Sequence, residues 1–189
     1  MAGWAKKKAL AGEIYLFFVD ETTLGLHPVL RSCWMKRGQQ KRISTPGQQQ
    51  WHHLFGAYNF LTDEVIALPA TAKNSDAFIA FLDFVVQQLP SDKPVILIMD
   101  NASYHHSAAT HAAFAILDER ILPQFLPPYC SNLNPIERFW RHLKDDSAAN
   151  TLFPTMQDLI NSVLVNLNKQ NDLHNPDRFT ISRDLEPST

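Results

Sequence analysis

The sequence predicts an α/β domain in which a mixed five-stranded sheet is covered by helices on both faces. Segments typical of strands dominate up to about residue 70, and the order then becomes helix, strand, helix, strand, helix. The apolar run PVILIMDN at residues 94–101 is typical of a central strand covered on both faces. No repeat or flexible linker divides the chain, and its 189 residues suit one domain.

The first part of the chain predicts an antiparallel meander. EIYLFFVDE at residues 13–21 is rich in aromatic and β-branched side chains, which indicates a buried strand. The period of two places Asp20 on one face of this strand and Glu21 on the other. The other side chains expected on the face of Asp20 are Ile14, Leu16 and Phe18. Two or three further strands are predicted, at about 31–37, 51–60 and 64–69, with turns near Pro46–Gly47 and Thr62–Asp63.

Helical periodicity begins after residue 70. Ser75 is the expected N-cap of a helix that ends near residue 89, and the buried stripe of this helix consists of Phe78, Ile79, Leu82, Val85, Val86 and Leu89. The remaining elements are a helix at 107–120, a strand at 121–126, a helix from Pro135 and a helix at 156–168. Thr155 is the expected cap of the last helix, with Asp158 three residues on.

The composition indicates a globular protein, with 45% hydrophobic and 19% charged residues. Cys33 and Cys130 lie far apart, which favours neither a disulfide framework nor a zinc knuckle and suits a reducing compartment. The apolar stretch after the basic start is too short for a signal peptide, and no run approaches a membrane span. We therefore expect a soluble cytoplasmic protein with no membrane partner, which has a basic lead-in at 1–12 and a polar tail at 171–189.

Basic residues gather in two places, although the formal net charge is −2. The total charge argues weakly against a nucleic-acid partner, so the local distribution matters more. A solvated face is the alternative for each cluster. The candidate DNA-binding residues are Arg31, Lys36, Arg37, Lys41 and Arg42 in one cluster and Arg138, Arg141 and Lys144 in the other.

Three carboxylates are the candidate catalytic residues. Asp20 and Asp100 each end a strong apolar strand, where α/β sheets place their ligands, although aspartates at strand ends also form turns. Glu137 lies in the first turn of a helix, where it could complete a capping box with Asn134 before Pro135. Three converging carboxylates would repel one another without a cation, and such oxygen ligands select Mg²⁺ or Mn²⁺. Two such ions about 4 Å apart can clamp a phosphodiester.

Two other groups of residues compete with this interpretation. The histidines His52, His53, His105, His106 and His111 are dense enough to suggest zinc, but their spacing does not match a helical zinc motif. Glu21 competes with Asp20 as a ligand, but it is expected on the opposite face of the sheet.

Three segments resemble the catalytic blocks of the insertion-sequence branch of the mariner superfamily of transposases. They are VDE at 19–21, MDNASYH at 99–105 and LPPYCSNLNPIERFW at 126–140, and the resemblance covers about residues 13–145. It implies a ribonuclease-H-like fold at 13–170 with a DDE triad of Asp20, Asp100 and Glu137. Ser131 stands where the family usually has proline, and the 36 residues between Asp100 and Glu137 slightly exceed the spacing for which the mariner branch is named.

The resemblance also implies a reaction and its partners. A cut-and-paste transposase uses Mg²⁺ or Mn²⁺, expected as two ions, to hydrolyse a phosphodiester at the end of its element. The freed 3′-hydroxyl then attacks target DNA, usually at a TA step. Asn101 and His105 are expected to support the ligands or position DNA. The expected partners are element ends, target DNA, an upstream helix-turn-helix half and, in the active form, a second copy.

Two alternatives to an active transposase remain. One is a catalytically silent DNA-binding remnant of a mobile element. The other is a ribonuclease-H-type nuclease, which shares the metal chemistry but is disfavoured by the LNPIERFW block.

Overall fold

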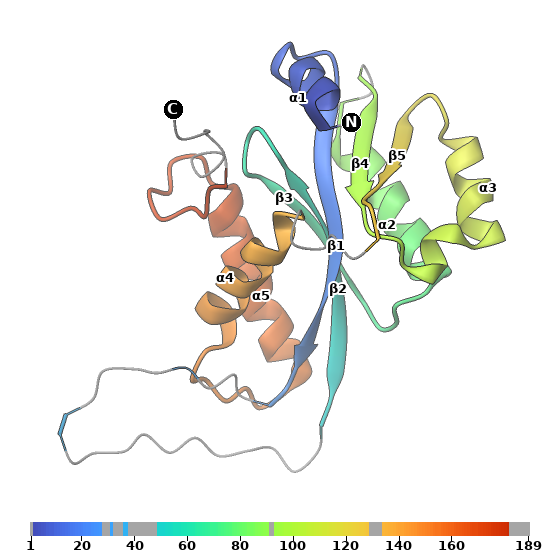
Figure 1. The fold of residues 1–189 in the computed structure, drawn as a ribbon. Coiled ribbons are helices and arrows are strands. Elements are labelled where there is room, and N and C mark those ends of the chain that lie inside the picture. The colour runs from blue at the N-terminus through green and yellow to red at the C-terminus, as the bar shows by residue number, and fades with distance from the viewer. Residues whose placement is uncertain are drawn as a thin grey trace.

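The computed structural model describes residues 2–27, 31, 36–37, 49–90, 93–128 and 134–181, and within them five strands form one mixed sheet (Figure 1). The order across the sheet is β3-β2-β1-β4-β5. The strands are β1 (Tyr15–Gly25), β2 (Trp51–Asn59), β3 (Val65–Ala70), β4 (Val95–Met99) and β5 (Ile121–Phe125). The helices are α1 (Ala2–Leu10), α2 (Ser75–Gln88), the short 3₁₀ helix η1 (Ser103–His106), α3 (Ala108–Ile116), α4 (Ile136–Ala148) and α5 (Met156–Asn171). The predicted fold class is confirmed.

The strand directions bring four carboxyl ends to one edge of the sheet. β2 pairs antiparallel with both β1 and β3, whereas β4 pairs parallel with β1 and β5. β1, β3, β4 and β5 therefore all run the same way, and the segments that follow them begin at the same edge. We refer to this edge as the carboxyl edge of the sheet.

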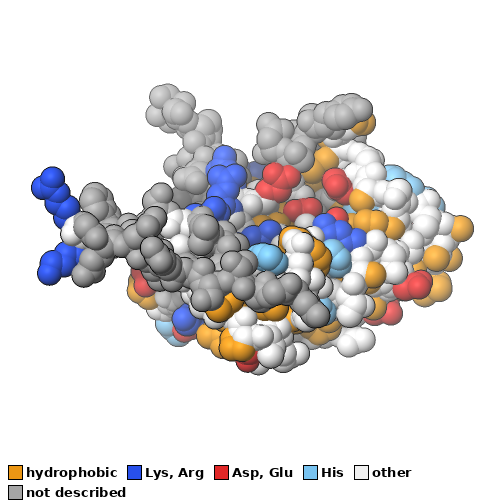
Figure 2. All heavy atoms as spheres, turned by 90° about the horizontal axis from the view of Figure 1, so that it is seen from below, with side chains coloured by type: hydrophobic (Ala, Val, Ile, Leu, Met, Phe, Trp, Pro, Cys, Tyr) orange, Lys and Arg blue, Asp and Glu red, His pale blue; other side chains and the backbone are white. Residues whose placement is uncertain are grey.

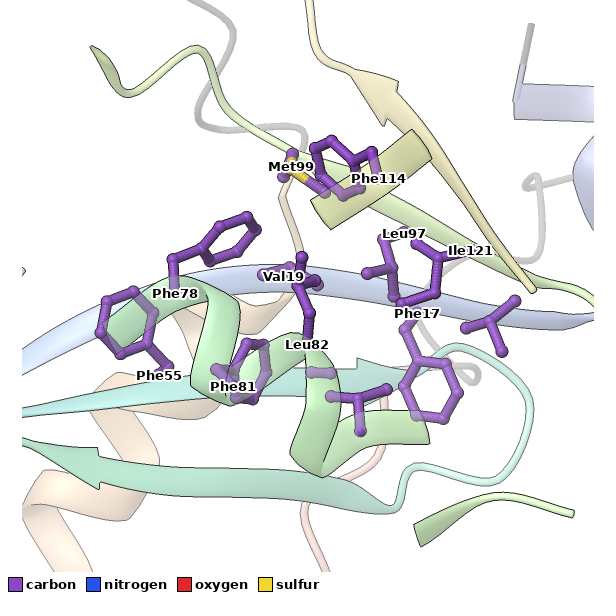
Figure 3. Packing of buried hydrophobic residues seen from close by; sticks show 13 residues of the cluster. Phe17, Val19, Phe55, Phe78, Phe81, Leu82, Leu97, Met99, Phe114 and Ile121 are labelled. Atoms are coloured by element: carbon purple, nitrogen blue, oxygen red, sulfur yellow. The ribbon is translucent and has the colours of Figure 1, made fainter. Parts of the chain in front are cut away.

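Helices cover both faces of the sheet, as predicted. α2 and α3 pack on one face, where Phe78 and Leu82 of α2 belong to the same buried cluster as Phe17 and Val19 of β1 (Figure 3). α1, α4 and α5 lie on the other face (Figure 1). Because side chains alternate along β1, Asp20 falls on the α4 face and Glu21 on the α2 face.

Two features of the first strand differ from the prediction. β1 continues to Gly25, because its antiparallel pairing with β2 extends beyond the point at which pairing with β4 ends. Helix α1 precedes it and buries Ala5 and Ala9 against Ile14 and Leu16. Three consecutive lysines interrupt the hydrophobic pattern of this helix, so its short apolar stripe gives little helical periodicity in the sequence.

Most of the predicted strand at 31–37 and the turn at Pro46–Gly47 lie outside the described residues. Residues 31, 36 and 37 are described, and they are not in a strand. The strands predicted at 51–60 and 64–69 correspond to β2 and β3, and the turn at Thr62–Asp63 joins them.

The helix caps confirm one prediction and correct another. Thr155 and Asp158 form the predicted capping box of α5. Ser75 is not the cap of α2, because Asn74 Oδ1 accepts the hydrogen bond from the Ala77 N–H at 2.9 Å. Ser75 Oγ instead donates to Ser107 Oγ at 2.8 Å. An asparagine directly before a serine caps equally well, so local sequence could not separate the two.

Two further observations concern the end of the described chain and the character of its helices. Ile181, in the predicted polar tail, is buried in the core formed by α4 and α5. Among the described residues, no helix combines the length and the apolar character that a membrane crossing requires.

Candidate active site

Asp20 and Asp100 lie level with each other at the carboxyl edge. The last parallel pair between β1 and β4 is Phe18 with Ile98, so the same register two residues further on sets Asp20 beside Asp100. Asp20 still pairs with Gly56 of β2 on its other side. The ladder with β2 therefore places the first carboxylate, two residues beyond the last pair with β4, and the end of β4 places the second.

Helix α4 brings Glu137 toward Asp20. Asn134 is buried, and its Nδ2 donates to the Val19 carbonyl at 2.9 Å, directly before Asp20 in the chain. This contact ties the start of α4 to the strand that carries the first aspartate. Glu137 follows three residues later, in the first helical turn, where its side chain is exposed.

The predicted cap of α4 is wrong. No side chain caps the first turn of this helix, and Asn134 Oδ1 accepts no hydrogen bond among the described residues. Asn134 uses its amide to hold β1 and therefore does not satisfy the N–H groups of α4. Pro135 has helical backbone angles of φ −65° and ψ −23°, as expected for proline at a helix start.

A close contact between Trp140 and Gly56 seats α4 on the sheet. Trp140 is buried, and a Cβ built on Gly56 would lie 2.6 Å from its Cζ2 atom and 3.4 Å from Cδ1 of Ile136. Only glycine lets the indole ring approach the backbone this closely. Because Gly56 pairs with Asp20 across the ladder, this contact fixes α4 next to the first aspartate.

The charges of the three carboxylates act on one another. Burial, together with the negative charges of Glu21, Asp100 and Glu137, raises the pKa of Asp20 from 3.8 to about 7, although a hydrogen bond from the Glu21 backbone opposes the shift. In the part of the chain that the structure describes, no three His, Cys, Asp or Glu side chains are gathered closely enough to hold a metal ion. The structure thus places the triad within electrostatic reach, at wider spacing than direct coordination requires.

The buried His105 ring contacts both the backbone and the carboxylate of Asp100. The ring is 1% exposed and is enclosed by Phe78 and Tyr104, with ring centroids 4.4 and 4.5 Å away. His105 Nδ1 lies 3.1 Å from the Asp100 carbonyl oxygen and 3.3 Å from Oδ1. The hydrogen bond with His105 lowers the pKa of Asp100, although partial burial opposes the shift. Asn101 is used differently, because its Nδ2 donates to the Leu126 carbonyl at 2.6 Å and joins the ends of β4 and β5.

The basic residues predicted to bind DNA fall into different environments. Lys144 is half-buried, and burial, assisted by the charge of Lys73, lowers its pKa, while Asp20 opposes the shift. Arg141 and Arg138 are exposed on α4, and Arg141 shares the helix face of Glu137 and Lys144. Figure 2 shows acidic, basic and histidine side chains close together near the middle of the face that β1 points toward.

The predicted basic cluster between Arg31 and Arg42 is only partly described. Arg31 is not a free cation, because its Nε donates to Asp145 Oδ1 at 2.7 Å. Lys36 and Arg37 are exposed. Lys41 and Arg42 lie outside the described residues.

Sequence reasoning missed Lys73. This lysine follows β3 by three residues, and its Nζ lies 3.4 Å from Glu21 Oε1. A lysine in the loop TAKNS carries no motif. It could have been found only from topology, because β3 runs parallel to β1 and its successor segment begins at the same carboxyl edge.

Comparisons with known proteins identify the family of this chain. Residues 15–160 match the family model described as DDE superfamily endonuclease. The "Insertion element IS630 uncharacterized 39 kDa protein" of Shigella sonnei is 31% identical over 148 residues, which are 78% of this chain and 43% of that protein. The chain therefore spans less than half the length of this relative.

Solved structures share the fold at low sequence identity. A crystal structure of the Mos1 strand transfer complex superimposes with a TM-score of 0.62 and 16% identity, over 88% of this chain and 50% of that one. The catalytic core domain of BIV integrase gives a TM-score of 0.54 and 19% identity, over 88% and 86% of the two chains. Since the family model spans more than half of the sequence and includes Asp20, Asp100 and Glu137, this chain belongs to the DDE superfamily endonucleases.

Proposed function

We propose that this chain is the catalytic domain of a cut-and-paste DNA transposase, with Asp20, Asp100 and Glu137 as its catalytic and metal-binding triad. The observation that carries the proposal is the bond from Asn134 to the Val19 carbonyl, which ties the helix of Glu137 to the strand of Asp20. That bond holds the start of α4 beside the residue that precedes Asp20, and the register of β1 with β4 supports Asp100 as the third member. Turn formation or helix capping by each residue alone would not require it.

The chemistry of these side chains fits a hard divalent cation. The raised pKa of Asp20 reflects its burial and the negative charges beside it, and a bound cation would offset both effects. When bound, Mg²⁺ or Mn²⁺ would activate the attacking oxygen and stabilise charge on the leaving oxygen. Solved paired-end complexes of the Mos1 mariner transposase contain Mn in one case and Mg in another, which supports the same choice here.

The other residues of the site would orient the ligands and the DNA. His105 holds the Asp100 carboxylate and so limits its rotation, which is the positioning role that a metal ligand needs. Lys144 and Arg141 share the face of Glu137 on α4 and would contact phosphate oxygens beside the triad. Arg138, Arg31, Lys36, Arg37, Lys41 and Arg42 would contribute charge further along the DNA.

The partners follow from the same proposal. The Mos1 structures include a paired-end complex with the left transposon end and a strand transfer complex, so we propose element ends and target DNA as substrates, with TA as the target step. Because this chain spans 43% of its insertion-element relative, recognition of the ends is assigned to a helix-turn-helix half outside it. The active form would be a homodimer in the prokaryotic cytoplasm.

The deciding measurement is nicking of a supercoiled plasmid with Mg²⁺ or Mn²⁺. We expect the wild-type chain to nick, and we expect both EDTA and Asp100→Asn to reduce nicking by at least about a hundredfold. Asp118→Asn is the matched control, since Asp118 is exposed and precedes β5 at the opposite edge. DNA binding without metal-dependent cleavage would instead support a silent remnant, and cleavage confined to RNA–DNA hybrids would support a ribonuclease.

Binding of DNA by this chain alone should not depend on sequence. Lys and Arg contacts to phosphates fix position but do not read bases. We expect less than about a tenfold preference for terminal-repeat DNA over scrambled DNA, and affinity that falls steeply as salt rises. Competition binding at physiological salt measures both. A larger preference for the repeat would place recognition within this domain.

A further inference from the structure

Besides the three carboxylates, an ion pair between Glu21 and Lys73 lies at the carboxyl edge, on the opposite face of the sheet from Glu137. Glu21 directly follows Asp20 on β1 and points toward the α2 face, where its Oε1 lies 3.4 Å from Lys73 Nζ. Its side chain is 12% exposed and that of Lys73 is 33% exposed. The lysine therefore reaches solvent while the carboxylate is largely covered.

The backbone explains why this lysine lies beside the triad. β3 runs parallel to β1, and the ladder aligns Ala70 with His53 and His53 with Thr23. The chain leaves β3 after Ala70, at the carboxyl edge, and enters α2 at Ser75, directly after the capping residue Asn74. Lys73 is held between a strand end and a capped helix start, which restricts where its side chain can reach.

The field of Lys73 extends across the site. Lys73 contacts Glu21, which directly follows Asp20, and its positive charge also contributes to the lowered pKa values of Asp100, at the end of β4, and of Lys144 on α4. Two lysines therefore flank the carboxylates, Lys144 from the α4 face and Lys73 from the α2 face. A phosphodiester held at the triad would lie between them.

We propose that Lys73 binds a non-bridging phosphate oxygen of the DNA strand held at the triad, and that Glu21 holds Lys73 in place until DNA arrives. The inference rests on the proposed function and adds a substrate-binding residue to it. An ammonium group offers three donors, so Lys73 can contact a phosphate and keep one bond to Glu21. Because Lys73 keeps a bond to Glu21, the largely covered carboxylate is not left without a partner when the phosphate binds.

The test compares four variants with the wild type in two assays. The first measures binding of a fluorescent DNA duplex across a range of salt concentrations, with Ca²⁺ so that the DNA is not cleaved. The second measures plasmid nicking. Lys73→Gln should lower kcat/KM for nicking by about tenfold or more. It should also reduce the slope of log affinity against log salt by about one, as expected for one lost phosphate contact. Lys73→Arg should keep the wild-type slope. Lys7→Gln is the matched control, because Lys7 is at an exposed position of α1 near the other edge of the sheet, and it should change neither quantity.

The fourth variant, Lys73→Gln with Glu21→Gln, separates phosphate binding from simple neutralisation of Glu21. If Lys73 binds phosphate, this double variant keeps the reduced slope. A return to the wild-type slope, or a Lys73→Gln slope equal to that of Lys7→Gln, would overturn the inference. The slope is measured from binding alone, so it decides the role of Lys73 even where wild-type nicking fails and the proposed function falls.

Discussion

Replacing Glu137 with glutamine is expected to reduce metal-dependent strand cleavage by at least about a hundredfold. Glutamine keeps the size of the side chain but removes the full charge that helps to hold a divalent cation. The free energy of unfolding should fall by less than about 1 kcal/mol, because the exposed Glu137 side chain makes no capping contact. Plasmid nicking and chemical denaturation of the same preparation measure the two effects.

The control for Glu137→Gln is Glu119→Gln, which removes the same charge from an exposed position before β5. This control should nick at the wild-type rate. Undiminished nicking by Glu137→Gln would mean that Glu137 is only a residue of the first helical turn. A loss of folding in that variant would show a structural role that the present contacts do not contain.

Gly56→Ala is expected to destabilise the protein by about 1–3 kcal/mol and to reduce cleavage at the same time. The added methyl group would meet the ring of Trp140 at 2.6 Å, and this ring is buried, so it cannot turn into solvent. Helix α4 must therefore move away from β1, and Glu137 moves with it. Thermal or chemical denaturation gives the first effect, and nicking at a temperature where the variant is folded gives the second.

Gly25→Ala separates this explanation from a general intolerance of alanine in strands. A Cβ on Gly25 would also be too close to a tryptophan, at 2.5 Å from Cζ3 of Trp51. Trp51 is 55% exposed, however, and its ring can turn into solvent. We expect a change in unfolding free energy within about 0.5 kcal/mol and full nicking activity. Equal losses in the two variants would contradict the proposed seating of α4 by Trp140.

The sequence predicts the sheet and most helices because their hydrophobic patterns are local and strong. The alternation in EIYLFFVDE separates Asp20 from Glu21 without any knowledge of the neighbours, and the structure confirms the separation. The extension of β1 to Gly25 depends on its pairing with β2, which is a long-range property. Helix α1 is stabilised by Ala5 and Ala9 against the sheet, and this packing leaves only a weak trace in the sequence.

In the candidate site, too, some features follow from local sequence patterns and others only from the tertiary structure. The three carboxylates are identified from strand ends, a helix start and a family resemblance. The role of Asn134 could not be predicted, because local preferences favour capping while the tertiary structure directs its amide to Val19. Lys73 and Gly56 carry no motif at all. Their importance comes from what the fold places beside them, which are Glu21 in one case and Trp140 in the other.

The two aspartates and Glu137 are positioned by different kinds of constraint. Asp20 and Asp100 share a strand register, and a slip of one residue would shift Asp20 by about 3.3 Å and turn it to the other face. A change of register would therefore move Asp20 in discrete steps, each of which separates it from Asp100. Glu137 is positioned by one indole ring on a glycine and one amide on a carbonyl, both of which yield by fractions of an ångström. Substitutions beneath α4 can thus adjust the third carboxylate gradually, which makes this helix the place where related sequences can tune the spacing of the site without rebuilding the sheet.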